Sequence, residues 1–294
     1  MSPPPVLVIT GPTAAGKTAA ALEVARHFDV RLVSADAMQV YRGLNIGTGK
    51  EAPDVLARFP HEGIDVRALE ESFDAQAFVE MADAVVEQEQ RVLIVGGSTF
   101  YVHAFLYGLV DTPDVDAGLR ARLEALDEPH AELVRVDPVL AERLHPNDRV
   151  RIVRGLEVFY LTGERLSDLH AAHATEVRHA GRVLWLDRPD LRERIDARVD
   201  AMMEAGYLEE VRGLLEAGVD RQLKPMQSLG YRHLADHLLG EIDLDEAIWR
   251  TKRDTWRFAR KQRTASNRFP QLERLHAGDI GAVVSIAEEL WSAG

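Results

Sequence analysis

The chain has 294 residues, which is long enough for one large α/β domain plus a smaller one. Of these residues 46% are hydrophobic and 28% charged, a composition that is ordinary for a globular protein. It contains no cysteine, which excludes disulfides, a thiolate nucleophile and a cysteine-ligated zinc site. The formal net charge of −13 by itself argues against a nucleic-acid partner.

The N-terminus, Met1-Ser2-Pro3-Pro4-Pro5, lacks the charged and then apolar layout of a signal peptide. No apolar run in the sequence approaches the length of a membrane span. We therefore expect a cytoplasmic protein without a membrane partner, and we take a monomer as the default.

An apolar run at residues 6–10 is followed by a glycine-rich loop and then by a helical pattern. The loop reads G-x-x-x-x-G-K-T, a phosphate-binding motif in the strand–loop–helix context that it requires. Its backbone N–H groups would bind phosphate oxygens, its lysine adds a positive charge, and its threonine hydroxyl can ligate Mg²⁺. A turn that merely links strand to helix is the alternative. This phosphate loop consists of Gly11, Pro12, Thr13, Ala14, Ala15, Gly16, Lys17 and Thr18.

Strand and helix patterns then alternate along the chain, which predicts a parallel sheet with right-handed crossovers. Ligands of such sheets gather at the carboxyl ends of the strands. The phosphate loop, Asp36 after the second strand and Gly96-Gly97-Ser98-Thr99 after the third should therefore share one edge of the sheet. The predicted strands are 6–10, 31–35, 91–96 and 183–187, and the predicted helices between them include 18–28, 74–89 and 192–204.

The residues after the second and third strands are candidates for chemistry. Asp36 can serve as a general base or as an indirect partner of Mg²⁺, although an Asx turn or a helix cap explains it equally well. The hydroxyls of Ser98 and Thr99 can bind a ligand or cap the helix predicted over 100–107. No acidic residue follows the third strand, which weakens an interpretation as a motor ATPase or GTPase.

The strand pattern stops between residues 113 and 180, where we expect a helical subdomain inserted into the α/β core. Three arginines gather where its last helix begins, and an anionic partner would offset their unfavourable interaction with the helix dipole. A surface salt-bridge network is the alternative. The pair His170-x-x-His173 has no accompanying carboxylates and does not indicate a metal site. The predicted helices of this subdomain are 119–126, 131–144 and 149–161.

The C-terminal third is predicted to be mostly helical. Residues 250–268 hold eight basic residues against one acid, Asp254, so this segment carries +7 and the rest of the chain −20. Phosphate backbones respond to such local clusters and not to the average charge of a chain. The segment is therefore a candidate nucleic-acid interface, with a solvated basic helix face as the alternative.

Taken together and in order, these segments resemble the tRNA dimethylallyltransferase family, also called tRNA isopentenyltransferases. The resemblance covers about residues 6–265, nearly the whole chain. It is carried by the phosphate loop, residues 34–48, Val95-Gly96-Gly97-Ser98 with Tyr101, residues 145–148 with Gly155-Leu156-Glu157-Val158, Gly230-Tyr231-Arg232, and residues 257–262.

The resemblance implies a P-loop NTPase-like parallel sheet core with an inserted all-helical subdomain and a helical C-terminal part. It implies transfer of a dimethylallyl group from dimethylallyl diphosphate to N6 of the adenosine on the 3′ side of the tRNA anticodon, with Mg²⁺ assisting and diphosphate leaving. The catalytic core would comprise 1–112 and 181–294, and residues 113–180 would bind the anticodon stem. The basic helix at 250–268 would support the RNA backbone.

The resemblance also implies roles for single residues. Asp36 would take the proton from N6, while Lys17, Thr18 with Mg²⁺ and Arg232 would stabilise the leaving diphosphate. The residues implied to contact tRNA are Asp36, Ala37, Met38, Gln39, Ser98, Arg120, Val150, Arg151, Ile152, Val153 and Arg154.

The chain departs from the family pattern at a few positions. Ala37 stands where serine is usual, and Ser98 where threonine is usual. Val150 replaces a glutamine, so a polar RNA contact would be lost, and Ala265 replaces a tryptophan, which removes one aromatic contact. Two other functions also fit the phosphate loop, namely a small-molecule or nucleoside kinase and a regulatory RNA-binding NTPase switch without transfer chemistry. Both require binding of a nucleotide such as ATP.

Overall fold

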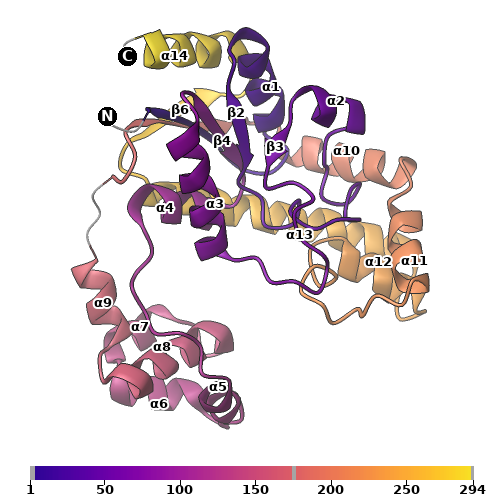
Figure 1. Cartoon of the computed structure of the whole chain (residues 1–294). Coiled ribbons are helices and arrows are strands. Elements are labelled where there is room, and N and C mark those ends of the chain that lie inside the picture. The colour runs from indigo at the N-terminus through magenta and orange to yellow at the C-terminus, as the bar shows by residue number, and fades with distance from the viewer. Residues whose placement is uncertain (1–3, 174–176, 293–294) are drawn as a thin grey trace. The chain divides into compact units, whose positions relative to one another are not determined.

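The computed structural model describes residues 4–173 and 177–292, and the chain divides into two compact units (Figure 1). The core unit comprises Met1–Leu106 and Val177–Gly294, and the helical unit comprises Tyr107–Glu176. The first boundary falls at the end of a helix in the core unit, a few residues before the position expected from the loss of the strand pattern. No helix among the described residues is long and apolar enough to cross a membrane.

The core unit is built on a six-stranded parallel sheet with the strand order β3-β2-β4-β1-β5-β6. All residues of β1 and β4 are buried, as expected for central strands that helices cover on both faces. The strands are β1 (Val6–Thr10), β2 (Arg31–Ser34), β3 (His61–Glu62), β4 (Val92–Gly96), β5 (Gly181–Asp187) and β6 (Leu272–His276).

The four strands predicted from the sequence are confirmed as β1, β2, β4 and β5. The two that were not predicted, β3 and β6, are the edge strands. β3 spans only two residues, and β6 reads Leu-Glu-Arg-Leu-His without a continuous apolar run. Edge strands are half exposed and need no such run, so the apolar pattern that reveals a central strand is missing from them.

Helices surround the sheet and supply the rest of the core. Leu7 and Ile9 of β1 pack with Val24 of the first helix and with Trp291 of the last. The helices predicted at 18–28, 74–89, 100–107 and 192–204 are present with nearly the same bounds. The helices of the core unit are α1 (Lys17–His27), α2 (Pro53–Arg58), α3 (Ala75–Gln88), α4 (Thr99–Tyr107), α10 (Leu191–Glu204), α11 (Tyr207–Glu216), α12 (Tyr231–Leu238), α13 (Leu244–Ala265) and α14 (Ile280–Ser292).

The described part of the helical unit, residues 107–173, contains helices and no strand. Leu133, Leu140, Ile152 and Leu156 form the centre of its own hydrophobic core. The helix predicted at 131–144 is in fact two helices, because Asp137 ends one and caps the next by accepting a hydrogen bond from the Leu140 N–H at 3.0 Å. The helices are α5 (Ala117–Glu124), α6 (Pro129–Val136), α7 (Pro138–Arg143), α8 (Arg149–Thr162) and α9 (Leu166–Ala172).

Candidate active site

A cavity of about 910 Å³ lies in the core unit at the carboxyl edge of the sheet. Its walls are the phosphate loop, the exits of β2 and β4, the segment 47–51, and helices α10, α12 and α13. This is where an open parallel sheet is expected to bind its ligand. Lys17, Thr18, Asp36, Ser98 and Arg232, all singled out from the sequence, line this one cavity.

The phosphate loop joins β1 to α1, as its motif requires. Because α1 begins at Lys17, its first backbone N–H groups have no partner within the helix and can bind phosphate oxygens. The ammonium group of Lys17 donates a hydrogen bond to the carbonyl oxygen of Pro12 at 2.8 Å, which folds the side chain back over the loop. The loop residues that line the cavity are Thr13, Ala14, Gly16, Lys17 and Thr18.

Lys17 has an unusual protonation equilibrium. Burial lowers its pKa from 10.5 to about 8, against the opposing attraction of Asp36, while the neighbouring Arg198 lowers it further. A phosphate anion bound beside the ammonium group would favour the charged form and restore the pKa toward its ordinary value.

We therefore expect the affinity for inorganic diphosphate to fall above about pH 8, because binding must then be accompanied by proton uptake on Lys17. Calorimetric titration should show the dissociation constant rising by up to about tenfold per pH unit between pH 8 and the ordinary lysine pKa. Below pH 8, the protonation of Lys17 should not change the dissociation constant with pH. Lys17→Met removes this contribution and leaves only the titration of diphosphate itself. Parallel pH profiles for the wild type and Lys17→Met would contradict the prediction.

Asp36 follows β2 and faces the phosphate loop. One carboxylate oxygen, Oδ1, accepts hydrogen bonds from the N–H groups of Met38 at 2.8 Å and Gln39 at 3.2 Å, so the Asx turn considered from the sequence is present. Among the described residues, no donor pairs with the other oxygen, Oδ2. The turn therefore holds Asp36 in place and leaves one oxygen for a substrate proton.

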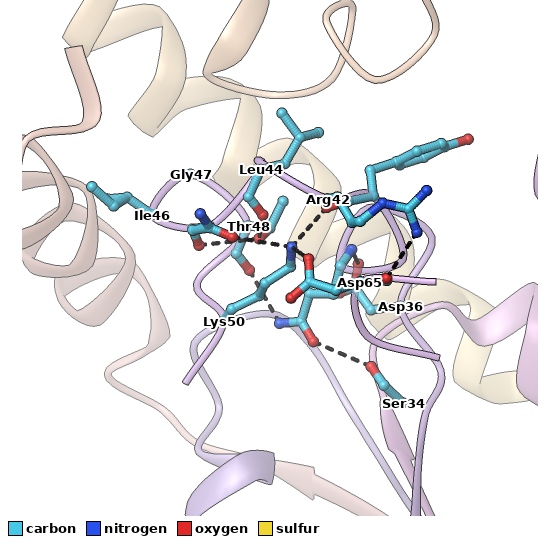
Figure 2. Close-up of polar contacts among 12 residues, drawn as sticks. Ser34, Asp36, Arg42, Leu44, Ile46, Gly47, Thr48, Lys50 and Asp65 are labelled. Atoms are coloured by element: carbon cyan, nitrogen blue, oxygen red, sulfur yellow. Dashed lines mark hydrogen bonds and ion pairs between the residues drawn. The ribbon is translucent and has the colours of Figure 1, made fainter. Parts of the chain in front are cut away.

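The segment after Asp36 is folded into a compact loop by side chains of its own (Figure 2). The amide of Gln39 accepts a hydrogen bond from the Ser34 hydroxyl at 3.2 Å and donates to the carbonyl oxygen of Thr48 at 3.3 Å. Lys50, with only 3% of its side chain exposed, donates to Asp65 at 2.5 Å and to the Tyr41 carbonyl oxygen at 2.7 Å. Gln39, which the resemblance places against adenosine, thus also holds the loop together.

Glu210 on α11 anchors the same loop from outside. Its carboxylate accepts hydrogen bonds from the backbone N–H groups of Asn45, Ile46 and Gly47 at 3.0, 2.8 and 3.2 Å. It also accepts one from the Tyr231 hydroxyl at 2.5 Å. Successive N–H groups that converge on one carboxylate form a strong attachment, so this wall of the cavity is fixed to α11 and α12.

Ser98 lies at the exit of β4 and contacts the residue that follows Asp36. Its hydroxyl oxygen accepts a hydrogen bond from the Ala37 N–H at 3.1 Å, which ties the exit of β4 to the exit of β2. Next to it, the Gln262 amide of α13 bridges two walls of the cavity, accepting from the Thr13 N–H at 2.9 Å and donating to the Gly97 carbonyl oxygen at 2.7 Å. Gln262 was noted in the sequence only as part of the segment 257–262, without this role.

Two arginines of α10, neither of which was predicted as a site residue, also line the cavity. Arg194 donates to the Ala14 carbonyl oxygen of the phosphate loop at 3.2 Å. Arg198 lies near both Asp36 and Lys17, and desolvation in the cavity lowers its pKa, with Asp36 acting in the opposite direction. Their spacing of four residues places both on one side of the helix, which was the only sequence signal that could have revealed them.

Arg232 is held at the cavity by a buried acid. Its guanidinium donates to Asp254 at 2.8 Å, and Asp254 also accepts from Arg253 at 2.8 Å and Arg257 at 3.3 Å. Arg253, followed by Arg232, holds the pKa of the Asp254 carboxyl well below its usual range, although burial acts in the opposite direction. The one acid of the basic segment therefore pairs with three arginines, of which Arg232 and Arg257 line the cavity.

Of the other basic residues in the segment, three form ion pairs and Lys261 lines the cavity. Arg250 pairs with Glu246 at 2.7 Å, Lys252 with Asp200 at 2.6 Å and Arg263 with Asp187 at 2.7 Å. The salt-bridge alternative thus explains part of the segment. The residues of α13 that line the cavity are Thr251, Asp254, Thr255, Arg257, Phe258, Lys261 and Gln262.

In the helical unit, two of the predicted tRNA-contacting arginines share one buried carboxylate. Arg120 and Arg154 donate to Glu157, which is fully buried, at 2.8 and 2.5 Å. Arg151 pairs with Asp148 at 3.1 Å but keeps 72% of its side chain exposed. Of the three arginines at the start of α8, Arg151 and Arg154 therefore form the ion pairs of the alternative interpretation, whereas Arg149 donates to the backbone carbonyl oxygens of Glu124 and Leu126 at 2.7 and 2.8 Å.

The other predicted contacts of this unit have opposite environments. Val150 is 82% exposed, whereas Ile152 and Val153 are buried in the core of the unit. The expectation that all five residues of 150–154 contact tRNA needs correction for the side chains of Ile152 and Val153, because helical periodicity turns one side of α8 inward.

We expect Glu157→Ala to destabilise the helical unit by about 2 kcal/mol, somewhat less than the roughly 3–5 kcal/mol typical for loss of one partner from a buried ion pair, because both arginines keep partial access to water. Denaturant unfolding followed by circular dichroism measures the change. Glu164→Ala, an exposed acid after the same helix, should shift stability by less than about 0.5 kcal/mol. Equal effects of the two substitutions would contradict a special role for Glu157.

Sequence comparison finds related proteins over most of the chain. The family described as IPP transferase matches residues 39–268. The tRNA dimethylallyltransferase 1 of Syntrophotalea carbinolica is 45% identical over 300 residues, covering 97% of this chain and 95% of that protein. That of Citrifermentans bemidjiense is 43% identical over 270 residues, 88% of each.

Solved structures agree in fold. The full-length tRNA isopentenylpyrophosphate transferase from Bacillus halodurans superposes with a TM-score of 0.72 at 29% identity, covering 98% of this chain and 97% of that one. A eukaryotic dimethylallyltransferase acting on tRNA superposes with a TM-score of 0.81 at 25% identity, covering 97% of this chain and 77% of that one.

Proposed function

This chain belongs to the IPP transferase family, the tRNA dimethylallyltransferases, and we propose that its cavity transfers a dimethylallyl group from dimethylallyl diphosphate to N6 of the adenosine on the 3′ side of the tRNA anticodon. The chain is thus a prenyltransferase that acts on tRNA. One observation carries the assignment of roles: the phosphate loop and Asp36, whose Oδ2 has no hydrogen-bond donor among the described residues, line the same cavity.

The reaction needs a base and a stabilised leaving group. The lone pair of N6 attacks C1 of the dimethylallyl group, the C1–O bond breaks, and diphosphate leaves with that electron pair. N6 is a weak nucleophile because its lone pair is delocalised into the ring, so removal of its proton must accompany attack. Asp36 Oδ2 accepts that proton, while the Asx turn through Oδ1 holds the carboxylate in position.

The departing diphosphate gains negative charge that the cavity must neutralise. Lys17 and the N–H groups at the start of α1 bind it from the phosphate loop. Arg232, oriented by Asp254, and Arg194 and Arg198 add positive charge from helices α12 and α10. Since the arginines cannot lose their protons in this pH range, their contribution does not depend on pH.

The site fits Mg²⁺ of the kind that binds mainly through substrate phosphates. Thr18 lines the cavity at the start of α1 and would hold the ion together with diphosphate oxygens and waters. Among the described residues no cluster of three His, Asp or Glu could hold a metal by itself. Bound Mg²⁺ would neutralise part of the charge that develops on diphosphate.

The tRNA is proposed to insert its adenosine at the loop that follows β2. Adenines in single-stranded loops are extruded more easily than paired ones, which favours a base in the anticodon loop. Residues 36–39 would then contact the base. The exposed basic residues of α13, Arg257, Arg260 and Lys261, would contact the RNA backbone. In the helical unit, Arg120, Val150, Arg151 and Arg154 would contact the anticodon stem. Because its substrate is tRNA, we also propose a cytoplasmic enzyme, with a monomer as the default expectation.

Incubation with unmodified tRNA, Mg²⁺ and radiolabelled dimethylallyl diphosphate tests the assignment. We expect label to enter tRNA and inorganic diphosphate to be released. If label stays out of the RNA while ATP supports phosphoryl transfer to a small acceptor, the chain is a kinase and the assignment fails. If ATP only changes the affinity for RNA and Asp36→Ala retains that behaviour, an RNA-binding switch is the correct interpretation.

A further inference from the structure

Helix α10 presents one line of side chains to the cavity: Arg194, Arg198 and Met202. A spacing of four residues keeps them on one side of the helix, about 6 Å apart along its axis. Along this line the chemistry changes from guanidinium to thioether. The line therefore has a charged end and an apolar end.

The charged end lies where the proposed reaction begins. Arg194 donates to the Ala14 carbonyl oxygen of the phosphate loop at 3.2 Å, and Arg198 lies near both Lys17 and Asp36. With diphosphate on the phosphate loop and the base at Asp36, the C1–O bond that breaks must lie close to Arg198. The hydrocarbon tail then extends away from the phosphate loop.

The apolar end begins at Gly49. A Cβ at this glycine would overlap the Arg198 guanidinium and would lie 3.3 Å from the methyl carbon of Met202, so the two side chain tips meet against its backbone. Beyond them, buried Val199 and Tyr207 also line the cavity. The Tyr207 ring lies against Gly47, in the loop that Glu210 anchors (Figure 2 shows Gly47 and Thr48 in this loop).

On the basis of the proposed function, we propose that Met202 closes the apolar end of the cavity and restricts the enzyme to five-carbon allylic diphosphates. A dimethylallyl tail that begins beside Arg198 would lie against Met202, because the tips of the two side chains meet at Gly49. A ten-carbon geranyl chain extends past Met202 and meets a wall whose loop is fixed by Glu210. The tail cannot lie on the side of the cavity near Asp36, because the adenosine would occupy the space beside residues 36–39.

The test compares dimethylallyl diphosphate with geranyl diphosphate as donors to the same tRNA. We expect Met202→Ala to raise the ratio of kcat/KM for the ten-carbon donor to that for the five-carbon donor by about tenfold or more, mainly through a lower KM for geranyl diphosphate. Met202→Leu, which preserves the volume, should keep the wild-type ratio. Met203→Ala is the matched control, because this neighbour on α10 does not line the cavity.

An unchanged ratio in Met202→Ala, with transfer of the five-carbon group retained, would overturn the proposal. Should Met202→Ala fail to fold by circular dichroism, Met202→Val provides the same comparison with a smaller volume change, and an unchanged ratio there has the same meaning. Failure of the wild type to transfer the dimethylallyl group at all would instead overturn the proposed function, so the two failures are distinct.

Discussion

Asp36→Asn is expected to lower kcat by about 10²- to 10⁴-fold, the range for removal of a positioned general base, while tRNA affinity changes little. Asparagine keeps an oxygen that can accept the two hydrogen bonds of the Asx turn from Met38 and Gln39, so the loop should persist. What is lost is the capacity of Oδ2 to take the proton from N6. Single-turnover kinetics with tRNA and labelled dimethylallyl diphosphate measure the chemical step directly.

Two further variants make this result specific. Asp36→Ala removes the turn as well as the base, so it should lower kcat at least as much and should weaken tRNA binding more than Asp36→Asn does. Asp29→Asn changes an exposed aspartate just before the amino end of β2, on the opposite edge of the sheet, and should leave kcat unchanged. Loss of tRNA binding in Asp36→Asn with a normal rate of the bound complex would argue for a binding role and against a base.

The second large effect concerns the leaving group. Lys17→Met should lower kcat/KM for dimethylallyl diphosphate by about 10²- to 10³-fold, as is typical when one stabilising donor for a developing anion is removed. Methionine retains the apolar stem of the side chain but neither the charge nor the hydrogen bond that Lys17 donates to the Pro12 carbonyl oxygen. Steady-state kinetics at pH 7 measure this loss, because the wild-type lysine is then protonated.

Lys224→Met serves as the matched control, since this exposed lysine does not line the cavity and should not affect either constant. The two effects should also differ in kind. Removal of the base in Asp36→Asn acts on kcat, whereas Lys17→Met should also weaken binding of inorganic diphosphate. Unchanged diphosphate affinity in Lys17→Met would show that Arg194, Arg198 and Arg232 suffice to hold the leaving group.

Much of the core unit could be predicted from the sequence, because its central strands are buried on both faces and must be continuously apolar. The phosphate loop was predictable because its motif is local, with all eight residues contiguous between a strand and a helix. Asp36 was predictable because parallel strands bring their carboxyl ends to one edge. The edge strands β3 and β6 escaped prediction since they are half exposed and carry no such run.

The opposite wall of the cavity could not be predicted in the same way. Arg194 contacts Ala14 across 180 residues of sequence, and Gln262 contacts Thr13 across 249. The four-residue spacing on α10 and the position of Gln262 in the segment 257–262 are signals in the sequence, but neither shows which loop residue each side chain contacts. The same holds for Ile152 and Val153, since only the packing of α8 shows which of its sides is buried.

The sequence by itself determined the phosphate loop, the four inner strands of the sheet, the position of the candidate base and the family to which the chain belongs. These depend on short contiguous motifs and on the period of apolar residues, both of which are local properties. Tertiary structure alone decided which arginines face the phosphate loop, that Asp254 orients Arg232, and that Met202 stands at the apolar end of the same line. Those properties depend on how distant helices pack against the sheet edge, which no local pattern encodes.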